Sequence, residues 1–259
     1  MFSNGKKPLR LIKQLMKWSN VTGDGIVLDF FSGSATTAHA VMQLNAADSG
    51  SRRSIMVQLP EPLDQNDSEQ KAAADFCNKL GKPRNIAELI KECLCRVGKK
   101  IREENSLFAG DLGFRVFKLA SSNIRAWEPD RDKLAETIEA SIEHLKTDRT
   151  EQDILFELLL KLGLDLCVPI ETKQVAGSAK QAHDIRSIGG GSLLVCLSPA
   201  IPQPDVEPLA LGLVAWHKQL KPAGDTTVVF RDSAFADDVA KTNLTAILHQ
   251  HGISNVRSL

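Results

Sequence analysis

The stretch GIVLDFFSGSATTAHAVMQL, residues 25–44, decides the fold. Residues 26–30 form a short apolar run, typical of a buried parallel strand, and this run carries an acid, Asp29, next to its end. A turn of small residues follows, and residues 36–44 then have helical composition. Open α/β sheets build cofactor sites from these parts, because small residues let a ligand approach the backbone and a helix N-terminus offers free N–H groups.

The pattern alone leaves an alternative open. Ser34 or Thr36 is available as N-cap of the helix. The stretch contains neither G-x-G-x-x-G nor G-x-x-x-x-G-K-[ST], so the fingerprints of dinucleotide and P-loop sites are missing. On pattern alone, an ordinary strand-to-helix corner of another α/β protein remains the alternative.

A resemblance narrows the choice. Residues 28–41, LDFFSGSATTAHAV, resemble the S-adenosylmethionine-binding motif of amino-methylating DNA methyltransferases, and in particular that of the modification subunits of type III restriction-modification systems. Lys7-Pro8 is similar to the K-P motif of that family, and residues 53–61, RSIMVQLPE, are similar to its second strand. The family usually has glycine where this chain has Ala35, whose Cβ is expected to crowd the cofactor or to demand an unfavourable backbone angle.

The resemblance implies a cofactor site made of matched residues. Asp29, Phe31, Gly33 and Ser34 would line the pocket, Lys7 would reach the carboxylate end of S-adenosylmethionine, and Glu61 would hold its ribose. The full set of expected cofactor-binding residues is Lys7, Pro8, Asp29, Phe30, Phe31, Gly33, Ser34, Thr36, Thr37 and Glu61. No metal site is expected. The alternative for Glu61 is a solvated carboxylate in a loop.

The family's catalytic motif is missing from this chain. Amino-methylating enzymes of this class use [N/D/S]-P-P-[Y/F/W], whose polar groups accept hydrogen bonds from the target amine and whose aromatic ring stacks on the flipped base. The sequence contains no Pro-Pro pair. In the permuted (beta) class that the resemblance implies, this motif and the target-recognition domain come first. We therefore expect the C-terminal portion of an adenine-N6 methyltransferase subunit, with no catalytic residue of its own.

This expectation has physical consequences. The strand at residues 26–30 would lose the neighbour that carries the catalytic motif, and it would expose backbone donors and apolar side chains. The expected partners are the missing N-terminal half, DNA through the complete subunit, a second copy of the chain, and the restriction helicase-nuclease subunit. Two alternatives remain. One is an interaction module for dimerisation or restriction-subunit docking. The other is a small-molecule methyltransferase, which is disfavoured because the stretches at 113–127, 189–197 and 228–244 are similar to the C-terminal part of the modification subunits.

The composition and charge of the chain are those of an ordinary globular protein. The chain has 259 residues, of which 42% are hydrophobic and 25% charged, with 32 basic and 32 acidic residues. Because a free-standing DNA-binding protein usually has a basic excess, DNA contact would need a local patch or another chain. The sequence has no apolar run long enough for a membrane span, no secretory signal, and five scattered cysteines, which together indicate a cytoplasmic protein with reduced thiols.

The expected fold class is α/β, with a partial Rossmann-like methyltransferase sheet in residues 1–110 and a smaller α/β domain for subunit interaction in residues 111–259. The basic residues of the helix at 85–104 fit a solvated face better than a phosphate-binding patch. The sequence shows no Ser/His/Asp arrangement. We expect helices at 7–18, 36–44, 70–80, 85–104, 130–145, 150–162, 209–220 and 237–250, strands at 26–30, 54–59, 113–119, 185–188, 193–197 and 226–230, and a surface loop at 172–183.

Overall fold

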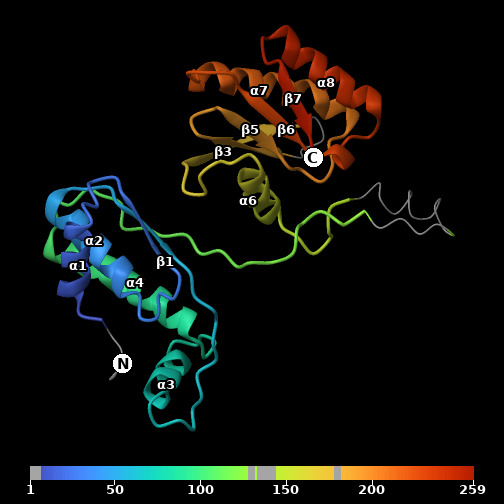
Figure 1. Ribbon diagram of the computed structural model, residues 1–259. Helices are drawn as coiled ribbons and strands as arrows, with labels where there is room; N and C mark the ends of the chain where they lie inside the picture. The colour runs from blue at the N-terminus through green and yellow to red at the C-terminus, as the bar shows by residue number, and fades with distance from the viewer. Residues whose placement is uncertain (1–6, 128–131, 133–143, 178–181) are drawn as a thin grey trace. The chain divides into compact units, whose positions relative to one another are not determined.

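The computed structural model describes residues 7–127, 132, 144–177 and 182–259. The chain divides into two compact units, Met1–Val116 and Phe117–Leu259, which are described separately (Figure 1). Most of the helix expected at 130–145 lies outside the described residues. No described helix is both long and apolar enough to cross a membrane.

The first unit is built around one strand-helix-strand element. Strands β1 (Ile26–Asp29) and β2 (Arg53–Met56) are parallel, with Ile26 opposite Arg53 and Asp29 opposite Met56, and helix α2 (Thr36–Asp48) connects them. The remaining elements of this unit are the helices α1 (Leu9–Trp18), α3 (Lys71–Lys79) and α4 (Ile86–Glu104). The two strands form a sheet on their own among the described residues.

Helix α2 lies at the centre of the packing in the first unit. On one side its Ala40, Val41 and Leu44 contact Ile12 and Met16 of α1. On another side its Ala38 and Met42 contact α4, while Ala73, Ala74 and Cys77 of α3 pack against Leu89 at the start of α4. Small alanines on α2 let three helices approach closely, so this helix contributes to the core on two sides.

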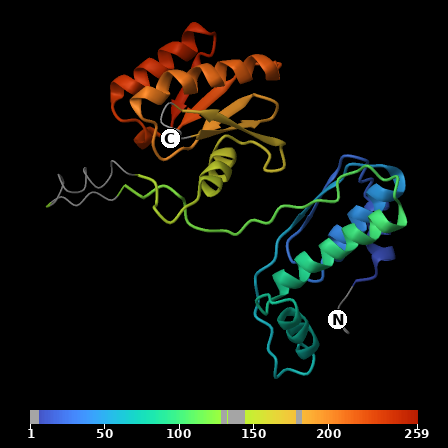
Figure 2. The same cartoon turned by 180° about the vertical axis from the view of Figure 1, so that it is seen from behind.

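The second unit is a five-stranded mixed sheet with helices on both faces (Figure 2). The strand order is β3-β4-β5-β6-β7, in which the first two pairs are antiparallel and the last two parallel. Helices α7 and α8 pack on one face, and α6 packs on the other. The bounds are α6 (Glu151–Lys161), β3 (Ile170–Ala176), β4 (Ala182–Ile188), β5 (Leu193–Cys196), η1 (Gln203–Asp205), α7 (Val206–Leu220), β6 (Thr227–Phe230), η2 (Asp232–Ala234), α8 (Asp238–Gln250) and β7 (Asn255–Ser258).

Several helix ends follow the local signals in the sequence. The Asn85 side chain accepts a hydrogen bond from the backbone N–H of Glu88, and Thr150 forms a full capping box with Asp153. Asp237 caps α8 through the backbone N–H of Ala240, so this acid has a structural role. The glycines between β4 and β5 form the turn of an antiparallel hairpin.

Two expectations about the second half of the chain were wrong. Residues 113–119 form no strand, because no described strand pairs with them, although their sequence alternates. Residues 172–183 are not a simple surface loop, since most of them belong to the β3–β4 hairpin, where Thr172 pairs with Arg186 and Val175 with His183. Their polar composition suits an edge strand, which faces solvent along one side.

Candidate functional site

The carboxyl end of β1 holds Asp29 in a fixed position. Its Oδ2 accepts a hydrogen bond of 2.6 Å from the hydroxyl of Thr37, and its Oδ1 accepts one of 3.3 Å from the backbone N–H of Phe31. The strand ladder continues past its end, because the N–H of Val57 donates to the Asp29 carbonyl at 2.9 Å. Asp29 is therefore connected to the strand end, to the following loop and to the first turn of α2.

The loop between β1 and α2 needs unusual backbone angles. Gly33 has φ of 50° and Ala35 has φ of 58°, so both adopt the left-handed conformation. This confirms the expected backbone demand on Ala35, whose side chain is fully buried. The N-cap of α2 is Ala35 and no side chain caps this helix, so the expectation that Ser34 or Thr36 would cap it was wrong. Ser34 and Thr36 instead form a 2.8 Å hydrogen bond with each other.

The polar groups of this loop differ in whether they already have partners. The N–H of Gly33 donates to Oε1 of Gln58 at 2.9 Å. The hydroxyl of Ser32 is buried and has no hydrogen-bond partner among the described residues. An orphaned buried hydroxyl and an uncapped helix N-terminus, placed beside a carboxylate, are groups that a polar ligand would satisfy.

The other expected residues of the site lie apart from this loop. Lys7 is exposed, and Pro8 is the N-cap residue of α1. Glu61 is exposed, and its backbone carbonyl accepts from the N–H of Ile86 at 3.1 Å. Within the described residues, neither the Lys7 nor the Glu61 side chain makes a hydrogen bond or ion pair with the loop after β1. The aromatic rings next to the loop are open, with Phe30 63% and Phe31 78% exposed.

One face of the two-stranded sheet is bare. Most of its outward side chains are large and apolar, and Arg53, opposite Ile26, is the charged one. The apolar ones are between 44 and 63% exposed: Ile26, Leu28, Phe30, Ile55, Val57 and Leu59. The opposite face carries α2. Parallel sheets normally have both faces covered, so this bare face and the free edge of β1 confirm the exposure expected from the sequence for the residues described.

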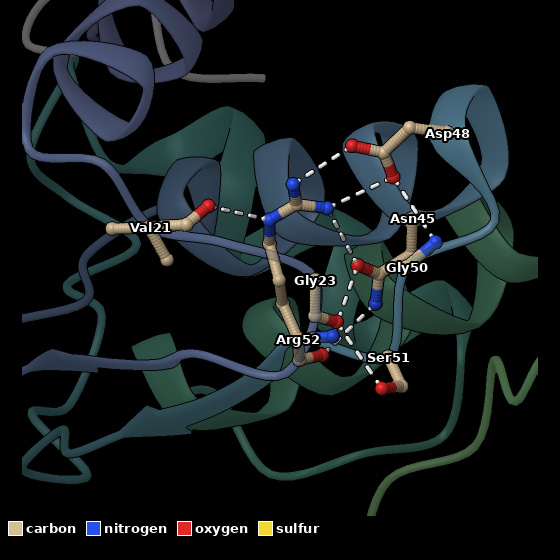
Figure 3. Close-up of polar contacts among 7 residues, drawn as sticks. All are labelled: Val21, Gly23, Asn45, Asp48, Gly50, Ser51 and Arg52. Atoms are coloured by element: carbon tan, nitrogen blue, oxygen red, sulfur yellow. Dashed lines mark hydrogen bonds and ion pairs between the residues drawn. The ribbon is translucent and has the colours of Figure 1, made fainter.

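A polar cluster fastens the opposite end of the same sheet (Figure 3). The Arg52 guanidinium donates to both carboxylate oxygens of Asp48, at 2.9 and 2.7 Å, and its Nε donates to the Val21 carbonyl at 3.0 Å. The Asn45 side chain exchanges hydrogen bonds with the backbone of Arg52 at 2.9 and 3.1 Å. This cluster joins the end of α2 to the starts of both strands and lies away from the candidate site.

The basic face of α4 is neutralised within the helix. Four of its basic residues have acidic partners three or four positions away: Lys91 with Glu88, Arg96 with Glu92, Lys99 with Glu103, and Lys100 with Glu104. These pairs agree with the prediction that the basic face of this helix is solvated and does not bind phosphates, because paired charges leave little net positive field.

The structure reveals polar residues that sequence reasoning missed. Gln58 accepts a hydrogen bond from the loop after β1. In the sequence, the only feature that could have pointed to Gln58 is its position just after β2. In the second unit, His183 joins Ser198 and Asp205, each at 3.0 Å, in a buried chain to which the Cys196 thiol adds a 3.6 Å contact with Ser198. The expectation of no Ser/His/Asp arrangement was wrong, because residues 15 and 22 positions from His183 meet only in the folded sheet.

This buried chain lacks access to a substrate. His183 and Asp205 are fully buried and Ser198 is nearly so. Burial raises the pKa of the Cys196 thiol, which stays protonated and can donate to Ser198. All five cysteines are free, and no described group of three His, Cys, Asp or Glu side chains gathers as a metal site requires.

Comparison with known proteins relates the chain to one kind of enzyme subunit. It is 39% identical over 115 residues to the StyLTI Mod subunit, a type III restriction-modification enzyme of Salmonella typhimurium, covering 44% of this chain and 16% of that protein. It is 36% identical over 118 residues to the EcoP15I Mod subunit of Escherichia coli, covering 46% of this chain and 15% of that protein. A shorter match, 50% over 40 residues, is to the type II methyltransferase M.KpnI of Klebsiella pneumoniae and covers 15% of this chain and 10% of that protein.

No family model matches the chain. The chain spans only about 15 to 16% of the length of the Mod subunits that it matches. The resemblance seen in the sequence is nevertheless confirmed: over somewhat less than half of its length, the chain is a relative of the modification subunits of type III restriction-modification enzymes.

Proposed function

We propose that residues 1–110 form the S-adenosylmethionine-binding part of a type III-like adenine-N6 DNA methyltransferase of the permuted class. One observation carries the proposal: Asp29 is held at the carboxyl end of β1, beside a left-handed small-residue loop and the uncapped N-terminus of α2. Ligands of open α/β sheets bind at this end of the strands. The relationship to Mod subunits supports the choice of cofactor.

The residues present fit the cofactor in kind. The Ser32 hydroxyl lacks a partner among the residues described, and the N-terminus of α2 has no side-chain cap, so both offer donors to a polar ligand. Asp29, Phe31, Gly33 and Ser34 would line the pocket, as expected from the sequence, while Lys7 and Glu61 would hold the two ends of the ligand. When bound, S-adenosylmethionine supplies an electrophilic methyl group.

The chain's own residues hold the cofactor but lack the group that prepares the nucleophile. The lone pair of an exocyclic amine is delocalised into the base, so methylation needs acceptors that polarise the amine. The chain has no Pro-Pro motif to supply them. We therefore propose that polypeptide outside these 259 residues completes the enzyme and brings the DNA contacts, and the bare face beside β1 supports this. A restriction subunit would join through residues 111–259.

Titration calorimetry with S-adenosylmethionine tests the proposal. We expect saturable binding by the purified chain and weaker binding by Glu61→Ala. Glu103→Ala, which removes an exposed carboxylate from α4, is the matched control and should bind as the wild type does. A folded chain that does not bind the cofactor at all contradicts the assignment.

A second function is favoured by a specific observation. The N–H of Gly33 is already bonded to Gln58, and Ala35, whose methyl group packs in the core, holds a left-handed backbone angle where the related motif has glycine. If these features block the pocket, the chain would serve as an interaction module for dimerisation or restriction-subunit docking. Gln58→Ala with Ala35→Gly would then restore cofactor binding that the wild type lacks.

A further inference from the structure

Helix α1 has two separate apolar faces. Ile12 and Met16 are buried against α2. Leu11, Leu15 and Trp18 are 47, 44 and 72% exposed, and we call these three residues the α1 stripe. Their spacing of four and then three residues puts them along one side of the helix, with the spacing of a seam between two packed helices. The α1 stripe is therefore shaped for a second helix.

The charged side chains of α1 itself are all positive. The charged residues of α1 are Arg10, Lys13 and Lys17, and its first turn contains no acid. Arg10 lies in that first turn, where the helix dipole disfavours a cation. None of the three makes an ion pair within the described part of the chain. Lys17 lies in the last turn, where the dipole favours a cation, so helix stability accounts for Lys17 but not for Arg10.

Helix α4 of the same unit provides the contrast. Its Lys91, Arg96, Lys99 and Lys100 each have a glutamate of α4 within 4 Å, at distances from 2.5 to 3.8 Å. Helix α4 thus neutralises its own surface, while α1 leaves its positive charge open beside exposed apolar side chains. Charge complementarity then calls for an acidic partner at α1.

The position of α1 matches a place where the unit is incomplete. The core that α1 shares with α2 includes Val27 of β1, whereas the core that α4 shares with α2 includes Met56 of β2. Helix α1 therefore lies on the side of β1, whose outer edge is unpaired among the described residues. A polypeptide that paired with this edge would lie on the same side of the unit as α1.

We propose that the α1 stripe, with Arg10 and Lys17, is a docking surface for an acidic amphipathic helix of a partner polypeptide. The partner helix would cover Leu11, Leu15 and Trp18 with its own apolar residues, and its carboxylates would pair with the two cations. Duplex DNA offers phosphates but no apolar surface for the two leucines. The inference goes beyond the proposed cofactor site and does not require it.

A designed peptide tests the docking surface. The probe is a labelled helical peptide of about three heptads, with leucine at a and d and glutamate at e and g, and the comparison peptide has lysine at e and g. Fluorescence anisotropy should show saturable binding of the glutamate peptide and not of the lysine peptide. The glutamates also keep the probe from pairing with itself.

Two double variants locate the binding on α1. Leu11→Ala with Leu15→Ala, and Arg10→Glu with Lys17→Glu, should each weaken binding about tenfold or more. Alanine is the best helix former, so the leucine variant keeps α1 folded. In the charge variant, glutamate at position 10 in the first turn suits the helix dipole and offsets the unfavourable glutamate at position 17 in the last turn. Circular dichroism of both variants verifies that α1 is retained. Lys99→Glu with Lys100→Glu on α4 is the matched charge control and should bind normally.

Three results would overturn the inference: equal binding of both peptides, no loss in either α1 variant, or leucine-dependent binding of duplex DNA or phosphatidylserine vesicles with no binding of the glutamate peptide. Titration of the same variants with S-adenosylmethionine keeps the two proposals apart. Loss of cofactor binding alone contradicts the proposed function, and loss of peptide binding alone contradicts the docking surface.

Discussion

The hydroxyl of Thr37 donates a 2.6 Å hydrogen bond to Oδ2 of Asp29 and so connects the end of β1 to the first turn of α2. Thr37→Val removes the hydroxyl while keeping the shape of the side chain. We expect a loss of about 1 to 2 kcal/mol in the free energy of unfolding, because the acceptor is a charged group. Cofactor affinity should fall as Asp29 becomes free to move. Denaturant unfolding and calorimetry measure the two effects, and Thr37→Ser, which keeps the hydroxyl, should show neither.

Ala35 and Ala38 form a matched pair, since both are buried at α2 and differ in backbone conformation. At Ala35, glycine relieves a left-handed alanine, worth about 1 to 2 kcal/mol, and this offsets the lost methyl group and the added flexibility of the unfolded chain. We expect Ala35→Gly to leave stability within about 1 kcal/mol of the wild type.

At Ala38 no such relief exists. Ala38→Gly inside the helix should cost about 2 kcal/mol, from helix propensity and the lost methyl group together. Urea unfolding of both variants makes the comparison. Equal losses at the two positions would mean that the left-handed angle at Ala35 carries no strain.

The Arg52 cluster should account for much of the stability of the first unit. Arg52→Ala removes the bonds to Asp48 and to the Val21 carbonyl, and we expect a loss of about 2 to 3 kcal/mol. Lys99→Ala, which breaks an exposed pair at 3.8 Å, should change stability by less than about 0.5 kcal/mol. Guanidinium unfolding monitored by circular dichroism distinguishes them.

The same cluster gives a pH dependence. The side-chain hydrogen bonds from Arg52 lower the pKa of Asp48 below its ordinary value of 3.8. The unfolded chain therefore binds this proton more readily, so the contribution of Asp48 is fully present above that ordinary value and is lost as the pH falls through the lowered pKa. Asp48→Asn should flatten this part of the acid unfolding curve. An unchanged curve would show that the pair contributes nothing in solution.

His183 and Asp205 should be strongly coupled, because their 3.0 Å contact is fully buried. His183→Ala deprives a buried carboxylate of one of its partners and should cost about 3 kcal/mol, whereas Ser198→Ala should cost about 1 kcal/mol. A double-mutant cycle with Asp205→Asn should give a coupling energy above about 1 kcal/mol. Additive effects within about 0.3 kcal/mol would mean that the contact is energetically unimportant.

The bare face of the first sheet should make the chain self-associate. Leu28 and Ile55 are cross-strand neighbours at its centre and are 49 and 51% exposed, so replacing both with serine removes exposed apolar surface. Sedimentation velocity should show weaker association of this double variant, by about tenfold. Leu160→Ser, at an exposed leucine of α6, is the control and should associate as the wild type does. A wild-type chain that stays monomeric and resists heating contradicts this prediction.

The sequence by itself determined the features that depend on local chemistry. The run ending near Asp29 predicts β1, and the small-residue turn predicts the loop. The helices expected from 85, 150 and 237 begin beside side chains that cap them, because such signals act within a few residues. The unfavourable angle at Ala35 was also readable, since the related motif has glycine there. The relationship to Mod subunits followed from the same residues.

Only the tertiary structure decided which distant residues meet. Residues 113–119 alternate like a strand but find no partner among the described residues, while the polar segment before His183 becomes part of a hairpin because β4 is there to pair with it. The contact of Gln58 with Gly33 and that of Asp205 with His183 join residues 25 and 22 positions apart. No local sequence pattern predicts such contacts, because strand pairing and burial depend on elements that are separated along the chain.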